Sequence, residues 1–256
     1  MQLKNGNWTA AQKGYKGSFA EKGEIEGTIP QYIKEETDDT FIEVTNLTYL
    51  FADCTGLKVM PRIPSTIKNM MNTFLNCNNL TTLSIIPNGI EVLGSTFSGC
   101  TSLIEAPNIP SSVTNMNQTF LNCRSLISAP IIPNSVVTMT QTFGGCTSLT
   151  TISNLPDNVE NMALTFYDCT SLKTVPEIPS SVTNMNQTFS GCSSLTGIIT
   201  INANLSGAII SGDKNDYYAV FWNAATNEGC SIKLTGTCPM LENIVSSTNR
   251  SNITLL

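Results

Sequence analysis

Hydrophobic residues recur along this chain with a period of 23 residues. In each unit a phenylalanine is followed three residues later by a cysteine, and three residues after that by a leucine. An Ile-Pro or Leu-Pro pair, a valine or isoleucine, and a methionine or leucine complete the unit, with polar residues between them. The phenylalanines are Phe51, Phe74, Phe97, Phe120, Phe143, Phe166 and Phe189, and the cysteines are Cys54, Cys77, Cys100, Cys123, Cys146, Cys169 and Cys192.

A unit of this length cannot bury its own apolar residues, so neighbouring units must stack and share one core. The apolar positions lie mostly three or four residues apart, which suits a coil that turns continuously and directs each of them inward. The pattern therefore predicts a mainly β or α/β solenoid. We expect a right-handed leucine-rich-repeat coil with a parallel β-sheet on one face and short turns or helical turns on the other.

Two segments of each unit compete for the strand of this sheet. One runs from Met116 to Phe120, and the other from Leu103 to Ile109, with their equivalents in the other repeats. Proline removes a backbone donor from a sheet, and Pro107 lies in the second segment. The composition thus favours the Met-x-x-x-Phe segment as the strand.

The decapeptide SSVTNMNQTF occurs twice, at residues 111–120 and 180–189, which are three repeats apart. Valine, methionine and phenylalanine in it are core positions, which leaves Asn117, Gln118, Asn186 and Gln187 as candidate binding or ladder-forming side chains. If the phenylalanine points inward, the threonine before it points outward. Such a threonine column resembles the arrays of ice-binding solenoids, although threonine is also an ordinary exposed strand residue. Its members are Thr73, Thr96, Thr119, Thr142, Thr165 and Thr188.

The period is lost toward both ends, where caps must shield the core of a solenoid. We expect an N-terminal cap over residues 1–40, repeats over 41–205 and a C-terminal cap over 206–256. The acidic residues of 35–39 form either a solvated loop or a cation site, and their spacing does not match an EF-hand. Aromatic residues in the C-terminal segment either close the core or form a binding site; they are Tyr217, Tyr218, Phe221 and Trp222.

The composition argues against catalysis, cofactors and metals. The chain has no histidine, which excludes Ser-His-Asp and Cys-His catalysis, and it has no Gly-rich phosphate loop. Seven of the nine cysteines recur at one register position, so we expect buried thiols that donate to backbone carbonyls. Cys230 and Cys238 lie outside that series and either pair or remain reduced. The sequence predicts a protein that is not an enzyme.

Charge and hydropathy narrow the range of partners. Only 12% of residues are charged and the net charge is −6, with no basic cluster, so we expect no nucleic-acid binding. No apolar run approaches the ~20 residues of a transmembrane helix, and the N-terminus shows no signal peptide. The protein either stays inside the cell or has lost a signal. We expect a monomer.

The stretch TFSGCTSLIEAPNIPSSVTNMNQTF resembles the cysteine-containing leucine-rich repeats of BspA-like bacterial surface proteins. The resemblance covers roughly residues 41–201, although this unit has one residue more between Leu and Ile-Pro than the common form, and one fewer between Val and Phe. It implies an extracellular or surface-displayed protein that adheres to a host or matrix protein or to a glycan. The alternatives are a passive spacer, a carbohydrate-binding module and the ice-binding solenoid.

Overall fold

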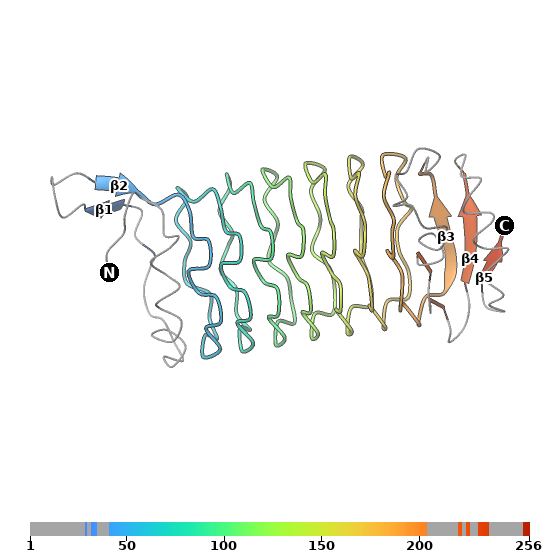
Figure 1. The fold of residues 1–256 in the computed structure, drawn as a ribbon, viewed down its shortest axis with the longest axis horizontal. Helices are drawn as coiled ribbons and strands as arrows, with labels where there is room; N and C mark the ends of the chain where they lie inside the picture. The colour runs from blue at the N-terminus through green and yellow to red at the C-terminus, as the bar shows by residue number, and fades with distance from the viewer. Residues whose placement is uncertain are drawn as a thin grey trace.

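The computed structural model describes residue 29, residues 32–34, 41–203, 220, 221, 224, 225, 230–235 and 253–256. Its central part is a stack of coils, one for each 23-residue repeat, which lie side by side along the long axis of the molecule (Figure 1). The paired strands β1 (Tyr32–Lys34) and β2 (Phe41–Glu43) lie at one end, and β3 (Gly197–Ile201), β4 (Cys230–Leu234) and β5 (Ile253–Leu255) lie at the other. No α-helix occurs among the described residues. The chain is thus a mainly β solenoid of the leucine-rich-repeat type.

The core is one continuous cluster that runs through every coil from Ile29 to Ile232. The phenylalanine side chains form a stack along its axis, with ring centroids 5.3–5.9 Å apart and interplanar angles of 2–15°. Phe221 extends this stack on Phe189, at 5.4 Å, and is buried. This packing supports the interpretation that Phe221 closes the core. The inward direction predicted for the phenylalanines, cysteines and leucines of the repeats is confirmed.

The strand lies in the segment that the sequence disfavoured. Strand β3 occupies the register of Glu105–Ile109, and β4 and β5 continue it as parallel neighbours. The Met-x-x-x-Phe segment is instead a run of turns, because Gln118 has φ 57° and its equivalents are also in the left-handed region. An extended strand cannot contain such a residue. The prediction of the strand at Met116–Phe120 was therefore wrong.

The extended segments of the other repeats are joined by single parallel bridges, such as Glu105 to Ser128 and Ser128 to Thr151. A second column of bridges lies beside the methionine position, where Asn115 pairs with Val92 and with Thr138. Burial alternates differently at the last repeat, since Ile198 is 59% exposed and Ile199 is buried. At this coil the core thus receives Ile199 and not Ile198.

Candidate functional site

The threonine before each phenylalanine is buried, and this overturns the outward column predicted from alternation. All six threonines are 0% exposed. The turn at the preceding left-handed residue rotates the threonine inward, where its hydroxyl meets two backbone carbonyls. Thr142, for example, has Oγ1 2.8 Å from the carbonyl oxygen of Met139 and 2.8 Å from that of Met116 in the preceding repeat. The threonines hold adjacent coils together and present no array to ice.

The cysteine ladder is confirmed as a structural feature. Six of the seven thiols, those of Cys77 to Cys192, donate to the carbonyl oxygen of the phenylalanine in the preceding repeat, as in Cys146 to Phe120 at 3.1 Å and Cys169 to Phe143 at 3.0 Å. All seven are buried and free. Burial raises the pKa of the Cys54 thiol to about 11 and those of Cys100 and Cys146 to about 12. Neutral thiols of this kind are poor nucleophiles and poor metal ligands.

Cys230 is likewise a buried free thiol, and burial raises its pKa to about 11. Its proposed partner Cys238 lies outside the described residues, as do Tyr217, Tyr218, Trp222 and the acidic residues of 35–39. In the part of the chain that the structure describes, no three His, Cys, Asp or Glu side chains converge as metal ligands would. None of the described segments forms a helix with the length and apolar character that a membrane crossing requires.

The candidate polar residues of the first decapeptide belong to side-chain ladders between coils. The amide of Gln118 donates to Gln141 at 2.7 Å and accepts from the hydroxyl of Ser95 at 3.0 Å. The Oδ1 atom of Asn117 accepts from the Thr138 hydroxyl at 2.7 Å. Both side chains are half-buried, so their polar groups already serve the stacking of repeats.

The second decapeptide differs, because Asn186 is exposed and Gln187 is half-buried. The backbone N–H of Asn186 donates to the side chain of Asn184 at 3.0 Å. Asn186 is therefore the member of the four candidates that remains most accessible to a partner. A binding role for Asn186 stays a prediction.

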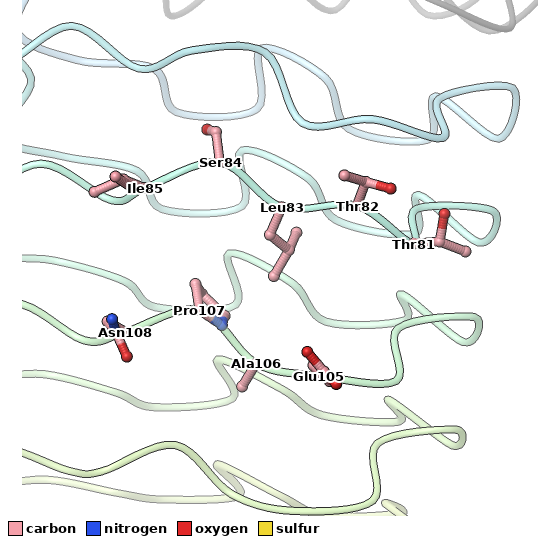
Figure 2. Close-up of a pocket in the computed structure, with 9 residues that line it drawn as sticks. All are labelled: Thr81, Thr82, Leu83, Ser84, Ile85, Glu105, Ala106, Pro107 and Asn108. Atoms are coloured by element: carbon pink, nitrogen blue, oxygen red, sulfur yellow. The ribbon is translucent and has the colours of Figure 1, made fainter.

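A pocket that sequence reasoning missed lies between two adjacent extended segments (Figure 2). Its volume is about 400 Å³, and it lies between Thr81–Ile85 of one coil and Glu105–Asn108 of the next. The Leu83 side chain points into the space between the coils, toward Ala106 and Pro107, whereas Ser84 points to the opposite side and donates to the Pro61 carbonyl at 3.0 Å. The pocket thus combines an apolar floor with a polar rim.

Large apolar side chains are exposed along the same series of extended segments, and one of them, Ile85, lines the pocket. Four isoleucines from three consecutive repeats form what we call the isoleucine patch: Ile85 (85% exposed), Ile104 (49%), Ile127 (51%) and Ile131 (76%). The equivalent positions of other repeats carry polar residues, such as Thr150, Asn108 and Asn154. This difference between copies was the sequence signal that could have located the surface. A pattern built only from the positions that all repeats share does not show it.

The comparisons with known proteins agree on this architecture. Residues 47–142 and 116–208, more than half of the chain, match the family described as "BspA type Leucine rich repeat region", with six copies. A comparison with curated protein sequences found no match.

Several solved structures are similar in fold, and two of them are described here. One is a leucine-rich repeat protein from Bacteroides ovatus, with 21% identity and a TM-score of 0.50 over 90% of this chain and 68% of that one. The other is a leucine-rich cell surface protein from Faecalibacterium prausnitzii, with 20% identity and a TM-score of 0.58 over 80% of this chain and 62% of that one. Together with the coil, the buried ladders and the family match, they show that this chain belongs to the BspA-type leucine-rich-repeat family.

Proposed function

We propose that this chain is a non-catalytic binding module that is displayed outside the cell or at its surface and adheres to a protein partner. The isoleucine patch carries the proposal. Ile131 exposes most of its side chain and Ile127 about half, on a rigid stack of coils. Other repeats carry polar residues at the equivalent positions. Apolar side chains grouped on an otherwise polar surface are typical of interaction sites.

The rigidity of the array supports this role. Each coil is joined to the next by backbone hydrogen bonds, by the threonine hydroxyls and by the phenylalanine stack. A partner would therefore meet a surface that is already ordered, which lowers the entropic cost of binding. Family membership supports the surface location, since one similar structure is named a cell surface protein.

Charge and composition limit the kind of partner. The chain has 13 basic and 19 acidic residues and no histidine, which favours neither nucleic acid nor acid–base catalysis. A host or matrix protein is the partner class that best fits an apolar patch with a polar surround. The chain itself acts as a monomer in this proposal.

A pull-down with purified matrix proteins tests the proposal with a matched pair of variants. The double variant Ile127→Thr and Ile131→Asn introduces residue types that other repeats carry at the same positions, so it keeps the fold. It should reduce retention at least tenfold, whereas Thr114→Asn, at an exposed position in another column, should not. Equal retention of both variants would refute the patch as the binding surface. If the wild-type protein retains nothing in the pull-down and on a glycan array, the chain is a passive spacer.

A further inference from the structure

One column of exposed residues on the extended segments carries a single charge. The column is formed by the second residue after each repeat leucine, and every member is exposed. Its members are Val59, Thr82, Glu105, Ser128, Thr151, Thr174 and Gly197. Glu105 is the only one with a charged side chain, so an exposed carboxylate stands where every other coil has an uncharged residue.

The pocket between the extended segments lies at this same coil. Val59 pairs with Thr82, and Glu105 pairs with Ser128, but no bridge joins Thr82 to Glu105. Within residues 59–174 it is the one step of the column without a bridge. The pocket of about 400 Å³ lies at this step and is lined by Glu105. The single charge of the column and the opening between coils therefore coincide.

The pocket joins an apolar wall to this one carboxylate. Glu105 lies at one end of it and Ile85 at the other, with Leu83, Ala106 and Pro107 between them (Figure 2). Glu105 and Ile85 are exposed, and Leu83 and Ala106 are half-buried. A ligand that fills the pocket therefore meets aliphatic carbon along most of its length and negative charge at one end.

No group in the described part of the chain neutralises this carboxylate. The Glu105 side chain accepts no hydrogen bond and forms no ion pair there. The nearest basic residues on the extended segments, Lys58 and Arg62, belong to the coil two before that of Glu105. At ~4.8 Å per coil they stand about 9.6 Å away, which exceeds the screening length of ~8 Å at physiological salt. The charge of Glu105 is thus available to a cation from outside.

We propose that this pocket receives a basic side chain, lysine or arginine, of the protein partner. Its aliphatic stem would contact Leu83, Ala106 and Ile85, and its cationic end would pair with Glu105. Lysine and arginine are the protein side chains that combine such a stem with a positive charge. This inference rests on the proposed function and deepens it, because it names the kind of residue that anchors the partner on the face of the isoleucine patch.

The pocket disfavours other occupants. A neutral apolar side chain would cover the Glu105 carboxylate and leave it without a partner, which costs free energy. A divalent cation requires several oxygen ligands, and among the described residues no three acidic or other metal-ligating side chains converge. An anionic group would be repelled by Glu105. The charge and the apolar wall together therefore select a cation on an aliphatic stem.

A basic side chain fits without any movement of the coils. The three residue steps from Glu105 to Asn108 span about 10 Å at ~3.3 Å per residue. A lysine side chain reaches about 6 Å from Cα to Nζ, through five bonds of ~1.5 Å. It can lie along the existing opening and replaces no backbone hydrogen bond. The bond from the Ser102 N–H to the Asn78 carbonyl, 3.1 Å, stays in place.

Three variants test the two halves of the pocket. Glu105→Gln removes the charge and keeps the size of an exposed side chain, so it leaves the fold intact. Glu160→Gln is the matched control, because Glu160 is also exposed but does not line the pocket. Ile85→Asn shortens the apolar wall with the residue type that Asn108 and Asn154 have at the equivalent position.

Binding is measured from backbone amide chemical shifts during titration with the Nα-acetyl N-methylamides of lysine, arginine and norleucine. Norleucine has an aliphatic stem without the charge. At residues 82–85 and 105–108, the Kd for lysine or arginine should be at least threefold lower than that for norleucine. Glu105→Gln should abolish this difference, Glu160→Gln should keep it, and Ile85→Asn should weaken the binding of all three compounds.

The basic compound that binds more tightly identifies the anchoring residue. Equal binding of norleucine and both basic compounds, no response at these residues, or an unchanged difference in Glu105→Gln would overturn the proposal. The titration uses small probes and does not depend on the matrix-protein pull-down. The pull-down variant Ile127→Thr and Ile131→Asn leaves the pocket residues unchanged, so the failure of either proposal can be recognised separately.

Discussion

The hydroxyl oxygen of Thr119 lies 3.0 Å from the carbonyl oxygen of Leu93 in the preceding repeat. It also lies 2.8 Å from the carbonyl oxygen of Met116 in its own repeat. A hydroxyl has one proton, so each threonine donates to one of its two carbonyls at a time. The same geometry recurs from Thr73 to Thr188, and it forms a buried column of hydroxyl–carbonyl contacts along the solenoid.

Replacing Thr119 by valine should lower the free energy of unfolding by about 1–2 kcal/mol. Valine has nearly the same shape, so the loss reports the buried hydrogen bond and not a cavity. Thr114→Val is the control, because Thr114 is exposed in the same decapeptide, and its change should remain within about 0.5 kcal/mol. Urea unfolding measures both. Equal stabilities for the two variants would show that the buried hydroxyl contributes nothing.

The contrast between the threonine and phenylalanine columns shows what the sequence could determine. A strict period with apolar residue types was enough to place Phe120, Cys123 and Leu126 in the core, because only stacking can bury them. The direction of Thr119 depends on the backbone between Met116 and Phe120. Alternation holds for a strand, but the left-handed φ of Gln118 turns this segment, and no composition rule marks glutamine for that conformation.

Neither the position of the strand nor the pocket was predicted from the sequence, and the reasons are related. Pro107 counted against its segment as a strand, yet the N–H that donates to the preceding coil belongs to the residue after the repeat leucine, as in Ile127 to Ile104, and the proline nitrogen is not needed there. The pocket lies beside Thr81 and Ile104, the one pair of such residues within 41–203 that does not make this hydrogen bond. The period describes what the repeats share, whereas this site depends on how two of them differ.

The phenylalanine stack should make neighbouring substitutions non-additive. Phe120→Ala and Phe143→Ala each should cost about 3–5 kcal/mol, because each leaves a cavity in a closed core. Their rings are 5.6 Å apart and stacked, so the double variant should deviate from the sum by about 0.5–3 kcal/mol. Phe51 and Phe189 lie at distant points of the stack, and alanine substitutions there should be additive. Additivity in the adjacent pair would contradict a shared core.

Stability should fall as the pH rises above about 9. The unfolded thiols ionise near pH 9.0, whereas burial holds the pKa of Cys100 and Cys146 near 12 in the folded protein. The folded state therefore retains protons that the unfolded state releases, so the stabilisation is complete below pH 9 and is lost as the pH rises toward 12. Each such thiol contributes a slope of about 1.4 kcal/mol per pH unit.

Denaturant unfolding between pH 8 and pH 11 measures this slope. Cys146→Ser keeps a donor for the Phe120 carbonyl but does not titrate in this range. The free energy of unfolding of this variant should therefore fall less steeply with pH, by the contribution of one thiol. Thiol counting gives a second check. The native protein should show no reaction of the ladder cysteines, and the denatured protein should show at least seven free thiols. A count below seven would contradict the reduced ladder.

Gly145 and Gly94 should respond oppositely to alanine. At Gly145, φ is 69° and a Cβ atom would lie 2.3 Å from Oδ1 of Asn122 in the preceding repeat. Gly145→Ala therefore meets both a backbone strain of about 1 kcal/mol and a steric clash, and it should destabilise the protein by about 1–3 kcal/mol. At Gly94 a Cβ atom would lie 3.7 Å from its nearest neighbour, which is ordinary contact. Gly94→Ala should be neutral or stabilising, because it restricts the unfolded chain.

The double variant Asn122→Gly and Gly145→Ala separates the two costs at this position, because Asn122 itself has φ 59° and glycine there adds no backbone strain. It removes the side chain that occupies the Cβ site, so it should recover part of the loss and leave the strain of the left-handed backbone. The pattern of the column supports this reasoning, since Gly99, Gly145 and Gly191 each follow a repeat in which Asn or Asp occupies the equivalent position, at Asn76, Asn122 and Asp168. Thermal unfolding of the single and double variants measures the recovery. A double variant no more stable than Gly145→Ala would show that the Asn122 side chain moves aside freely, and that backbone conformation alone selects glycine there.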